Sequence, residues 1–213
     1  MKKLLIAVSL FAAAAGTLSA NAIWLFGGGV GYTNQATAGG HPWSASSLGL
    51  MVNSYFDVNG SLGVYSAATI GFMAGAQDNG TTLNVAQYQN IGLNILLGVG
   101  YRMPLTPGLT AIGGAGMYLG SATLAANNQT LSSYFAGGFG AGIGLSLLYA
   151  ISMNWGIGVN INAAYSFANP GDVAPTMSPQ GIGIFGGIGV TYFAYPVLEV
   201  PTYSRLKAVT TTR

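Results

Sequence analysis

The sequence predicts an all-β protein, an eight-stranded antiparallel up-and-down transmembrane β-barrel, on three observations. Only 5% of the 213 residues are charged, whereas about a quarter are charged in a typical soluble domain. Glycine is abundant, with 34 residues. Several stretches alternate apolar with small or polar residues, most clearly residues 155–167, WGIGVNINAAYSF. This period of two is that of a strand with two different faces, and aromatic residues at both ends of the apolar face suit the two interfaces of a bilayer.

The first 22 residues have the pattern of a secretory signal peptide. Lys2 and Lys3 form a basic start, residues 4–15 are apolar, and residues 20–22 give a small-x-small cleavage site. Cleavage after Ala20 is the close alternative, and an uncleaved anchor is less favoured because the apolar run is short for a bilayer. Removal of two of the six basic residues leaves four against four acidic ones. The mature chain is then neutral, which gives no footprint for nucleic acid.

The chain contains no cysteine. An exported protein without cysteine has no disulfide framework, and it has no thiol that could carry a lipid anchor. We therefore expect the fold to be held by its sheet alone.

Eight strands are expected from the alternation, each bounded by turn or loop signals. They cover residues 22–32, 47–58, 61–73, 88–101, 109–120, 133–149, 155–167 and 181–195. Asn59-Gly60, between the second and third, is a strong hairpin signal. The fifth strand is the weakest, because Ile112 and Tyr118 fall on the face where small residues are expected.

The connections are expected to alternate between long and short. Long loops are predicted at 33–46, 74–87, 121–131 and 168–179, and short turns at 59–60, 102–108 and 152–154. Outer-membrane barrels have an even number of strands, short periplasmic turns and longer outer loops. This predicts a barrel over residues 23–195 in the outer membrane of a diderm, Gram-negative-type bacterium, with both termini and a tail of residues 196–213 in the periplasm.

A bundle of membrane helices is the rival interpretation. Glycine at every second position is unfavourable for a helix and suits a curved sheet. A closed sheet also leaves no edge with unpaired backbone groups in the membrane. The barrel is therefore preferred.

Residues 23–195 resemble the small eight-stranded outer-membrane barrels, the group that includes the OmpA transmembrane domain, OmpX and the OmpW-like proteins. The resemblance is architectural, and no motif selects one subfamily. It implies contact with outer-membrane lipid and with the barrel assembly machinery, which often recognises a C-terminal aromatic residue. Tyr192, Phe193 and Tyr195 are the available aromatics, but the chain departs from the pattern by continuing from Pro196 to Arg213.

No catalytic residue, metal site or cofactor is predicted. His41 is the only histidine, and it lies in a predicted loop, as does Asp78. The lipid A palmitoyltransferase family, also eight-stranded, uses a histidine and an Asp-Ser pair, whereas Asn79 follows Asp78 here. One histidine and four scattered carboxylates do not make a convincing hydrolase or metal site.

Two sets of side chains follow from the alternation. The first set should line the lumen: Met51, Asn53, Tyr55, Tyr65, Asn94, Tyr118, Gly140, Gly158, Asn160, Asn162 and Phe185. The second should form aromatic girdles at the two membrane interfaces: Trp24, Tyr32, Phe56, Phe72, Tyr101, Phe135, Tyr149, Trp155, Phe167 and Tyr192.

The lumen suggests two functions. Only Asp57 is charged among the inward positions. If the inward glycines leave free volume, the barrel would be a narrow passive conduit for small neutral or hydrophobic solutes. The OmpW-like resemblance implies the same function. The alternative is that the inward aromatics lie across the glycines of neighbouring strands and close the barrel. It would then be a structural, surface-display or adhesion protein without transport. The conduit is narrowly preferred at this point.

Overall fold

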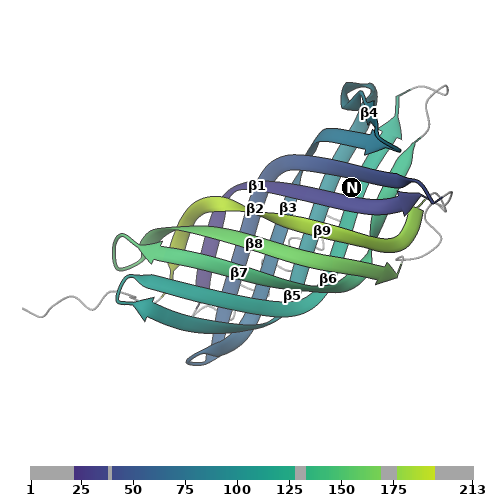
Figure 1. Ribbon diagram of the computed structural model, residues 1–213. Helices are drawn as coiled ribbons and strands as arrows, with labels where there is room; N and C mark the ends of the chain where they lie inside the picture. Colours follow the sequence, from purple (N-terminus) through teal and green to yellow (C-terminus); the bar gives the residue numbers. More distant parts are fainter. Residues whose placement is uncertain (1–21, 38–39, 128–132, 169–176, 195–213) are drawn as a thin grey trace, which may run out of the picture.

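The computed structural model describes residues 22–37, 40–127, 133–168 and 177–194, which form one antiparallel sheet closed into a barrel (Figure 1). Its strands are β1 (Ala22–Thr37), β2 (Pro42–Asn59), β3 (Leu62–Asp78), β4 (Thr81–Leu83), β5 (Tyr88–Thr106), β6 (Leu109–Ala126), β7 (Tyr134–Ala150), β8 (Trp155–Ala168) and β9 (Met177–Phe193). Consecutive strands pair, except that β5 pairs with β3 and not with β4, and β1 closes the barrel by pairing with both β2 and β9. The short β4 pairs with β3 alone among the described strands, so eight strands make the barrel.

One 3₁₀ helix, η2 (Val85–Gln87), connects β4 to β5. Within the described parts of the chain, no helix has the length and apolar character needed to cross a membrane.

The eight predicted strands are confirmed, but most are longer than the alternation indicated. Residues 33–37 and 42–46, predicted as loop, belong to β1 and β2, and the predicted loop 74–87 contains the end of β3, all of β4, and η2. The turn expected over residues 102–108 is only Pro107-Gly108, and β6 and β9 extend into the predicted loops 121–131 and 168–179. Backbone pairing continues for as long as a neighbouring strand is present, whereas apolar alternation stops where the outer face becomes polar.

Two tight hairpins depend on glycine in the left-handed region. Gly60 has φ +73° in the turn between β2 and β3. Asn79 (φ +49°) and Gly80 (φ +79°) join β3 to β4, and positive φ at both central residues is typical of a type I′ turn. The second Asn-Gly turn was visible in the sequence but was predicted as loop.

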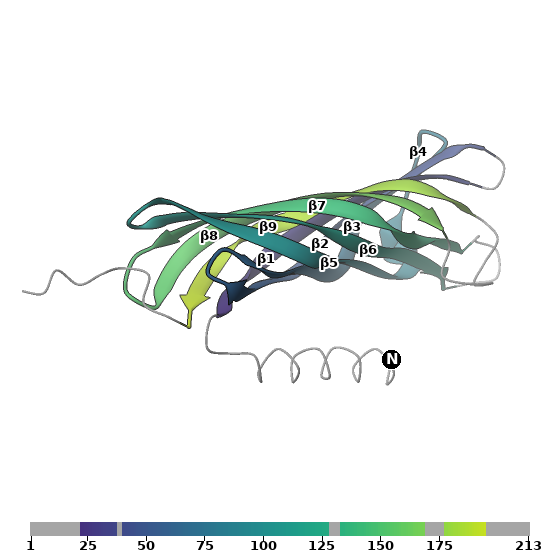
Figure 2. The same cartoon turned by 90° about the horizontal axis from the view of Figure 1, so that it is seen from below.

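The two ends of the barrel differ. One end carries the turns 60–61, 107–108 and 151–154, and we call it the short-turn end. At the other end, residues 42–46 of β2 and 75–83 of β3 and β4 extend the sheet outward as a flap, seen from two sides in Figures 1 and 2. Above the pair Gly71–Gly92, β3 no longer pairs with β5, and β4 takes that edge.

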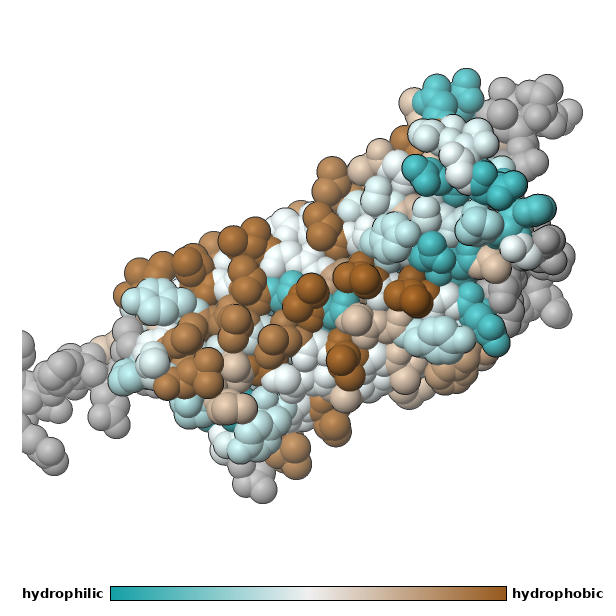
Figure 3. Space-filling model, in the orientation of Figure 1, coloured by the Kyte–Doolittle hydropathy of each residue, from teal (hydrophilic) through white to brown (hydrophobic). Residues whose placement is uncertain are grey.

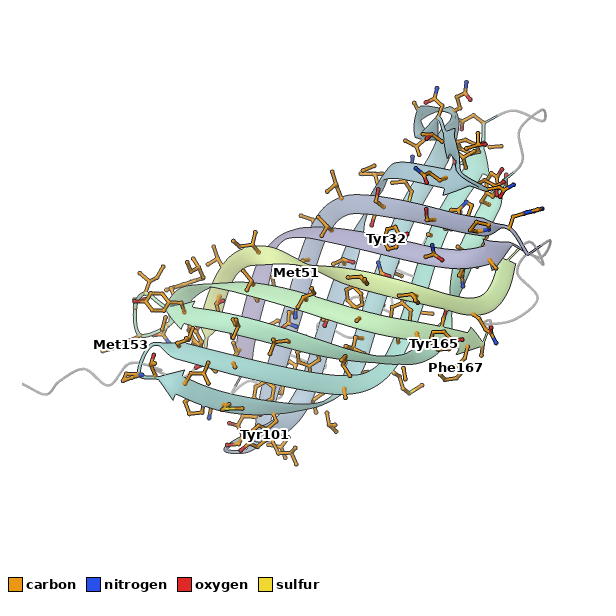
Figure 4. All side chains as sticks on the ribbon, in the orientation of Figure 1. Tyr32, Met51, Tyr101, Met153, Tyr165 and Phe167 are labelled. Atoms are coloured by element: carbon orange, nitrogen blue, oxygen red, sulfur yellow. The ribbon has the colours of Figure 1, made fainter. Side chains whose placement is uncertain are left out.

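The outer surface carries a wide apolar belt. Figure 3 shows hydrophobic side chains over the part nearer the short-turn end and hydrophilic ones around the flap. Seven predicted girdle aromatics are exposed: Tyr32, Phe72, Tyr101, Tyr149, Trp155, Phe167 and Tyr192. Figure 4 shows Tyr101 toward the short-turn end and Phe167 toward the other. Trp24 and Phe135 are half-buried. Phe56 is buried at 6% exposure because the Trp24 ring packs edge-on against it at 5.3 Å.

A β-bulge at Ala74 reverses the faces of β3. Ser47 pairs with Met73 and Ser46 with Gly75, which leaves Ala74 as an extra residue in β3. Below the bulge the even-numbered Phe72 faces outward, whereas above it Ala76 is buried and Gln77 is exposed. A one-residue shift of this kind exchanges inward and outward side chains, so the flap presents a small, polar outer face.

Candidate functional site: the barrel interior

Tyr65 crosses the middle of the barrel. From β3 its hydroxyl donates to Oδ1 of Asn162 at 2.8 Å and accepts from Nδ2 of Asn160 at 2.7 Å, and both asparagines belong to β8. The ring lies on Gly114 of β6 and Gly144 of β7, where an added Cβ would overlap the tyrosine. Tyr65 is 0% exposed. A side chain of this size therefore occupies the lumen with no room for water beside it.

An uncharged hydrogen-bond network surrounds this tyrosine. Nδ2 of Asn160 also donates to Oγ of Ser146 at 3.0 Å, and Ser146 donates to Oδ1 of Asn53 at 3.5 Å. Nδ2 of Asn162 donates to the Phe185 carbonyl at 3.2 Å and to Oδ1 of Asn160. Buried polar groups are costly unless they are bonded, and among the atoms of this network Nδ2 of Asn53 has no partner. The remaining bonds hold Tyr65 in the lumen without any ion pair.

A second tyrosine fills the next layer toward the flap. The Tyr118 hydroxyl donates to Oδ1 of Asn94 at 2.7 Å, and Nδ2 of Asn94 donates to Thr69 at 3.4 Å. The Tyr118 ring stacks on Phe185 with centroids 6.0 Å apart. Its hydroxyl end lies over two further glycines, Gly120 and Gly183.

The only ion pair among the described residues lies at the short-turn end. Nη2 of Arg102 is 3.1 Å from Oδ2 of Asp57 and donates to the Gly60 carbonyl at 2.7 Å. Arg102 was predicted in a turn, but β5 continues through it and turns its side chain toward Asp57 on β2. The pair joins the β2–β3 turn to β5.

The interior at the flap end is a separate apolar cluster. Trp43 is fully buried and stacks on Tyr134 with centroids 6.4 Å apart. The Tyr134 hydroxyl donates to Oδ2 of Asp78 at 3.1 Å. Burial, together with this hydrogen bond and the Asp78 charge, raises the pKa of Tyr134 to about 12. The hydrogen bond from Tyr134 to Asp78 joins the flap to β7.

Gln35 completes the wall above the last β7–β8 pair, Phe139–Ala168. From β1 its side-chain amide donates to the Gly137 carbonyl at 3.2 Å and accepts from the Gly137 N–H at 2.9 Å. These are the two bonds that a neighbouring strand would make. Sequence reasoning missed Gln35 and Trp43 because both lie in the predicted loop 33–46.

The predicted lumen residues are all buried. The nine with side chains are at most 5% exposed: Met51, Asn53, Tyr55, Tyr65, Asn94, Tyr118, Asn160, Asn162 and Phe185. Gly140 and Gly158 are buried too, but neither borders open space. A Cβ on Gly140 would overlap the Tyr165 carbonyl, and one on Gly158 would lie 2.9 Å from Oγ1 of Thr191. The free volume that a conduit needs is therefore absent at both glycines.

The interior offers no ligand set for a metal. Within the described ranges, no three or more His, Cys, Asp or Glu residues are grouped so that they could hold an ion. The groups that meet in the lumen are amides, hydroxyls and rings, which donate and accept hydrogen bonds and fill space.

Comparisons with known proteins bear on the fold. Scans of the sequence against protein-family models and against curated proteins find no match. Among solved structures, the outer membrane protein OprG from Pseudomonas aeruginosa superposes with a TM-score of 0.57 at 14% identity, over 82% of this chain and 96% of that one. Neisserial surface protein A gives a TM-score of 0.53 at 14% identity, over 82% and 97%. The chain therefore has the fold of the eight-stranded outer-membrane β-barrels.

Proposed function

We propose that this protein is an integral outer-membrane barrel with a closed lumen, and that it acts at the cell surface through its flap end. The observation that carries the proposal is Tyr65, which spans from β3 to β8 with no exposed surface. Tyr118 closes a second layer in the same way. Surface display or adhesion fits a plugged barrel better than transport does.

The apolar belt supports the placement in a membrane. Leu50, Val58, Phe72, Met117 and Ile188 are each exposed by more than half on the outer face. A continuous apolar surface of this kind is unfavourable in water and marks contact with lipid or another protein. Outer-membrane lipid and the barrel assembly machinery are the partners we infer. The predicted signal peptide, residues 1–22, and the predicted tail, 196–213, lie almost entirely outside the described residues and stay predictions.

The conduit is the second candidate. The uncharged amides of Asn94, Asn160 and Asn162 could hydrogen-bond a small neutral solute, which favours this class over ions. Passage would require the Tyr65 and Tyr118 rings to move away from the glycines on which they lie. Both hydroxyls would also have to break their hydrogen bonds to the asparagines. A closed lumen needs no such motion, and we prefer it for that reason.

Purified protein in liposomes tests the closed lumen. Wild-type protein is expected to raise uptake of a small neutral sugar no more than protein-free vesicles do, because side chains occupy both central layers. Uptake is measured by liposome swelling, with a water-filled porin as positive control. Swelling above the protein-free baseline, in vesicles whose protein is folded, would establish the conduit instead.

The orientation is tested with an epitope placed in one of two hairpins. An epitope between Asn79 and Gly80 is expected to bind antibody on intact cells, because we place the flap outside. The matched control carries the same epitope between Pro107 and Gly108, and it should bind antibody only after the outer membrane is opened. The reverse pattern would contradict the proposed orientation.

A further inference from the structure

The flap carries a groove on its outer surface. Its volume is about 270 Å³, and it is lined by Tyr32, Ser44, Ala45, Ser46, Gly75, Ala76, Gln77 and Thr82. Tyr32 stands on β1 at one side, and the paired residues Gln77 and Thr82 of β3 and β4 stand at the other. Ser44 and Ser46 lie between them on β2. The groove thus needs four strands, three of which form the flap.

The Ala74 bulge makes the groove. It places Gly75 opposite Ser46, and the nearest atom that a Cβ on Gly75 would meet is Oγ of Ser46, at 3.4 Å. If the register of Ser47 and Met73 continued without the bulge, Ala74 would lie opposite Ser46 and Gly75 would shift off this face. Bulges are common at sheet edges and barrel rims as well as beside functional sites, where they redirect side chains. The volume is close to the lower limit of about 300 Å³ for small-molecule pockets, so the groove suits one ring-sized group.

The chemistry of the lining selects an uncharged polyhydroxyl group. Two serines, a threonine and a glutamine offer hydroxyl and amide partners, and no lining residue is charged. The Tyr32 ring is exposed beside them, and its hydroxyl accepts from Nδ2 of Asn34 at 3.3 Å. A sugar ring presents an apolar face to an aromatic ring and hydroxyls at its edge. A phosphate is bound most strongly by Arg or Lys, and neither residue lines the groove.

The groove adjoins the apolar belt. Leu48 lies two residues below Ser46 on the same face of β2, about 7 Å away at the rise of an extended strand. It pairs with Phe72, and the two are 58% and 74% exposed. A molecule held in the groove by a polar headgroup can therefore lay acyl chains on Leu48 and Phe72.

We propose that this groove binds the uncharged sugar headgroup of a membrane glycolipid, whose acyl chains lie against Leu48 and Phe72. The proposal rests on the membrane placement and on the outward orientation of the flap inferred above, and it does not depend on whether the lumen is closed. The glycolipid would then be a lateral ligand of the outer leaflet, bound outside the barrel.

The test uses the whole protein in phosphatidylcholine nanodiscs. A glucosyl diacylglycerol is titrated in, with the same diacylglycerol lacking the sugar as a matched probe and methyl glucoside as a soluble sugar. The readout is the NMR shift of the Ser46, Gly75 and Gln77 amides. We expect saturable shifts with the glycolipid alone. Gly75→Leu should weaken this binding at least about tenfold, because its side chain fills the groove while its Cβ makes only an ordinary contact.

Gly28→Leu is the matched control, because Gly28 is exposed on the outer face of β1 and a Cβ there meets nothing within 4 Å. It should leave glycolipid binding unchanged. Equal shifts with the sugar-free lipid, equal shifts with methyl glucoside, or full binding by Gly75→Leu would each overturn the proposal. Failure of the protein to enter nanodiscs at all would instead contradict the membrane placement on which it rests.

Discussion

Tyr65→Ala is expected to lower the free energy of unfolding by about 3–5 kcal/mol, the range for deleting a large buried ring. The change empties the space above Gly114 and Gly144 and removes the hydroxyl that Asn160 and Asn162 share. Tyr65→Phe keeps the ring and should cost about 1–3 kcal/mol, because it takes the donor from the buried Oδ1 of Asn162 and one acceptor from Nδ2 of Asn160. Urea unfolding in lipid vesicles, followed by tryptophan fluorescence, measures both.

Tyr101→Ala serves as the control for this pair. Tyr101 has the same chemistry but lies on the outer face at 53% exposure, so its loss removes contact with lipid and leaves no cavity inside the barrel. It should therefore cost less than Tyr65→Ala. Unfolding of Tyr65→Ala at the wild-type urea concentration would contradict the central role of Tyr65. Liposome swelling with the Tyr65→Ala protein shows whether Tyr118 alone keeps the lumen closed.

Gly140→Phe is expected to prevent the barrel from closing. Gly140 lies at the shift in register between β7 and β8, and a Cβ there would overlap the Tyr165 carbonyl of β8. Backbone atoms cannot rotate away as a side chain can, so the two strands would have to separate. The folded, heat-modifiable band on a gel should be lost, and circular dichroism should show less sheet.

Gly28→Phe is its control, since the new ring would project from the outer face into open space. This variant should fold like the wild type. A folded Gly140→Phe barrel would show that the β7–β8 register can shift at this point. The result matters because the sequence alone presents Gly140 as a position where a large side chain would fill the lumen.

The alternation of side chains predicts which face of a strand points inward. The alternation in β8 predicts that Asn160 and Asn162 face the interior, and both are buried. It cannot predict that Tyr65, 97 residues before Asn162 in the chain, bonds to both. That contact joins two strands that are not neighbours in the sheet. It depends on how tightly the barrel curves, which no local pattern records.

The sequence was less informative about strand ends and bulges. Polar residues such as Ser44 and Gln77 suggest a loop, yet they pair in the flap, because backbone pairing needs a hydrogen-bonding neighbour and not an apolar side chain. The bulge at Ala74 cannot be recognised in the sequence either. Near this residue, the alternation of apolar and small side chains is acceptable whether the even-numbered or the odd-numbered residues face outward. The lumen site predicted from the sequence therefore contained none of the groove residues. The Asn79-Gly80 pair was the one signal in the sequence that could have predicted the β3–β4 turn.

By itself the sequence determined the barrel class, the number of its strands and the scarcity of charge in the interior, because composition and a period of two depend only on local order. Tertiary structure decided what the glycines do. A glycine on an inward face is equally compatible with an empty lumen and with a ring lying on it. The choice depends on a side chain from another strand, and here Tyr65 and Tyr118 occupy that space.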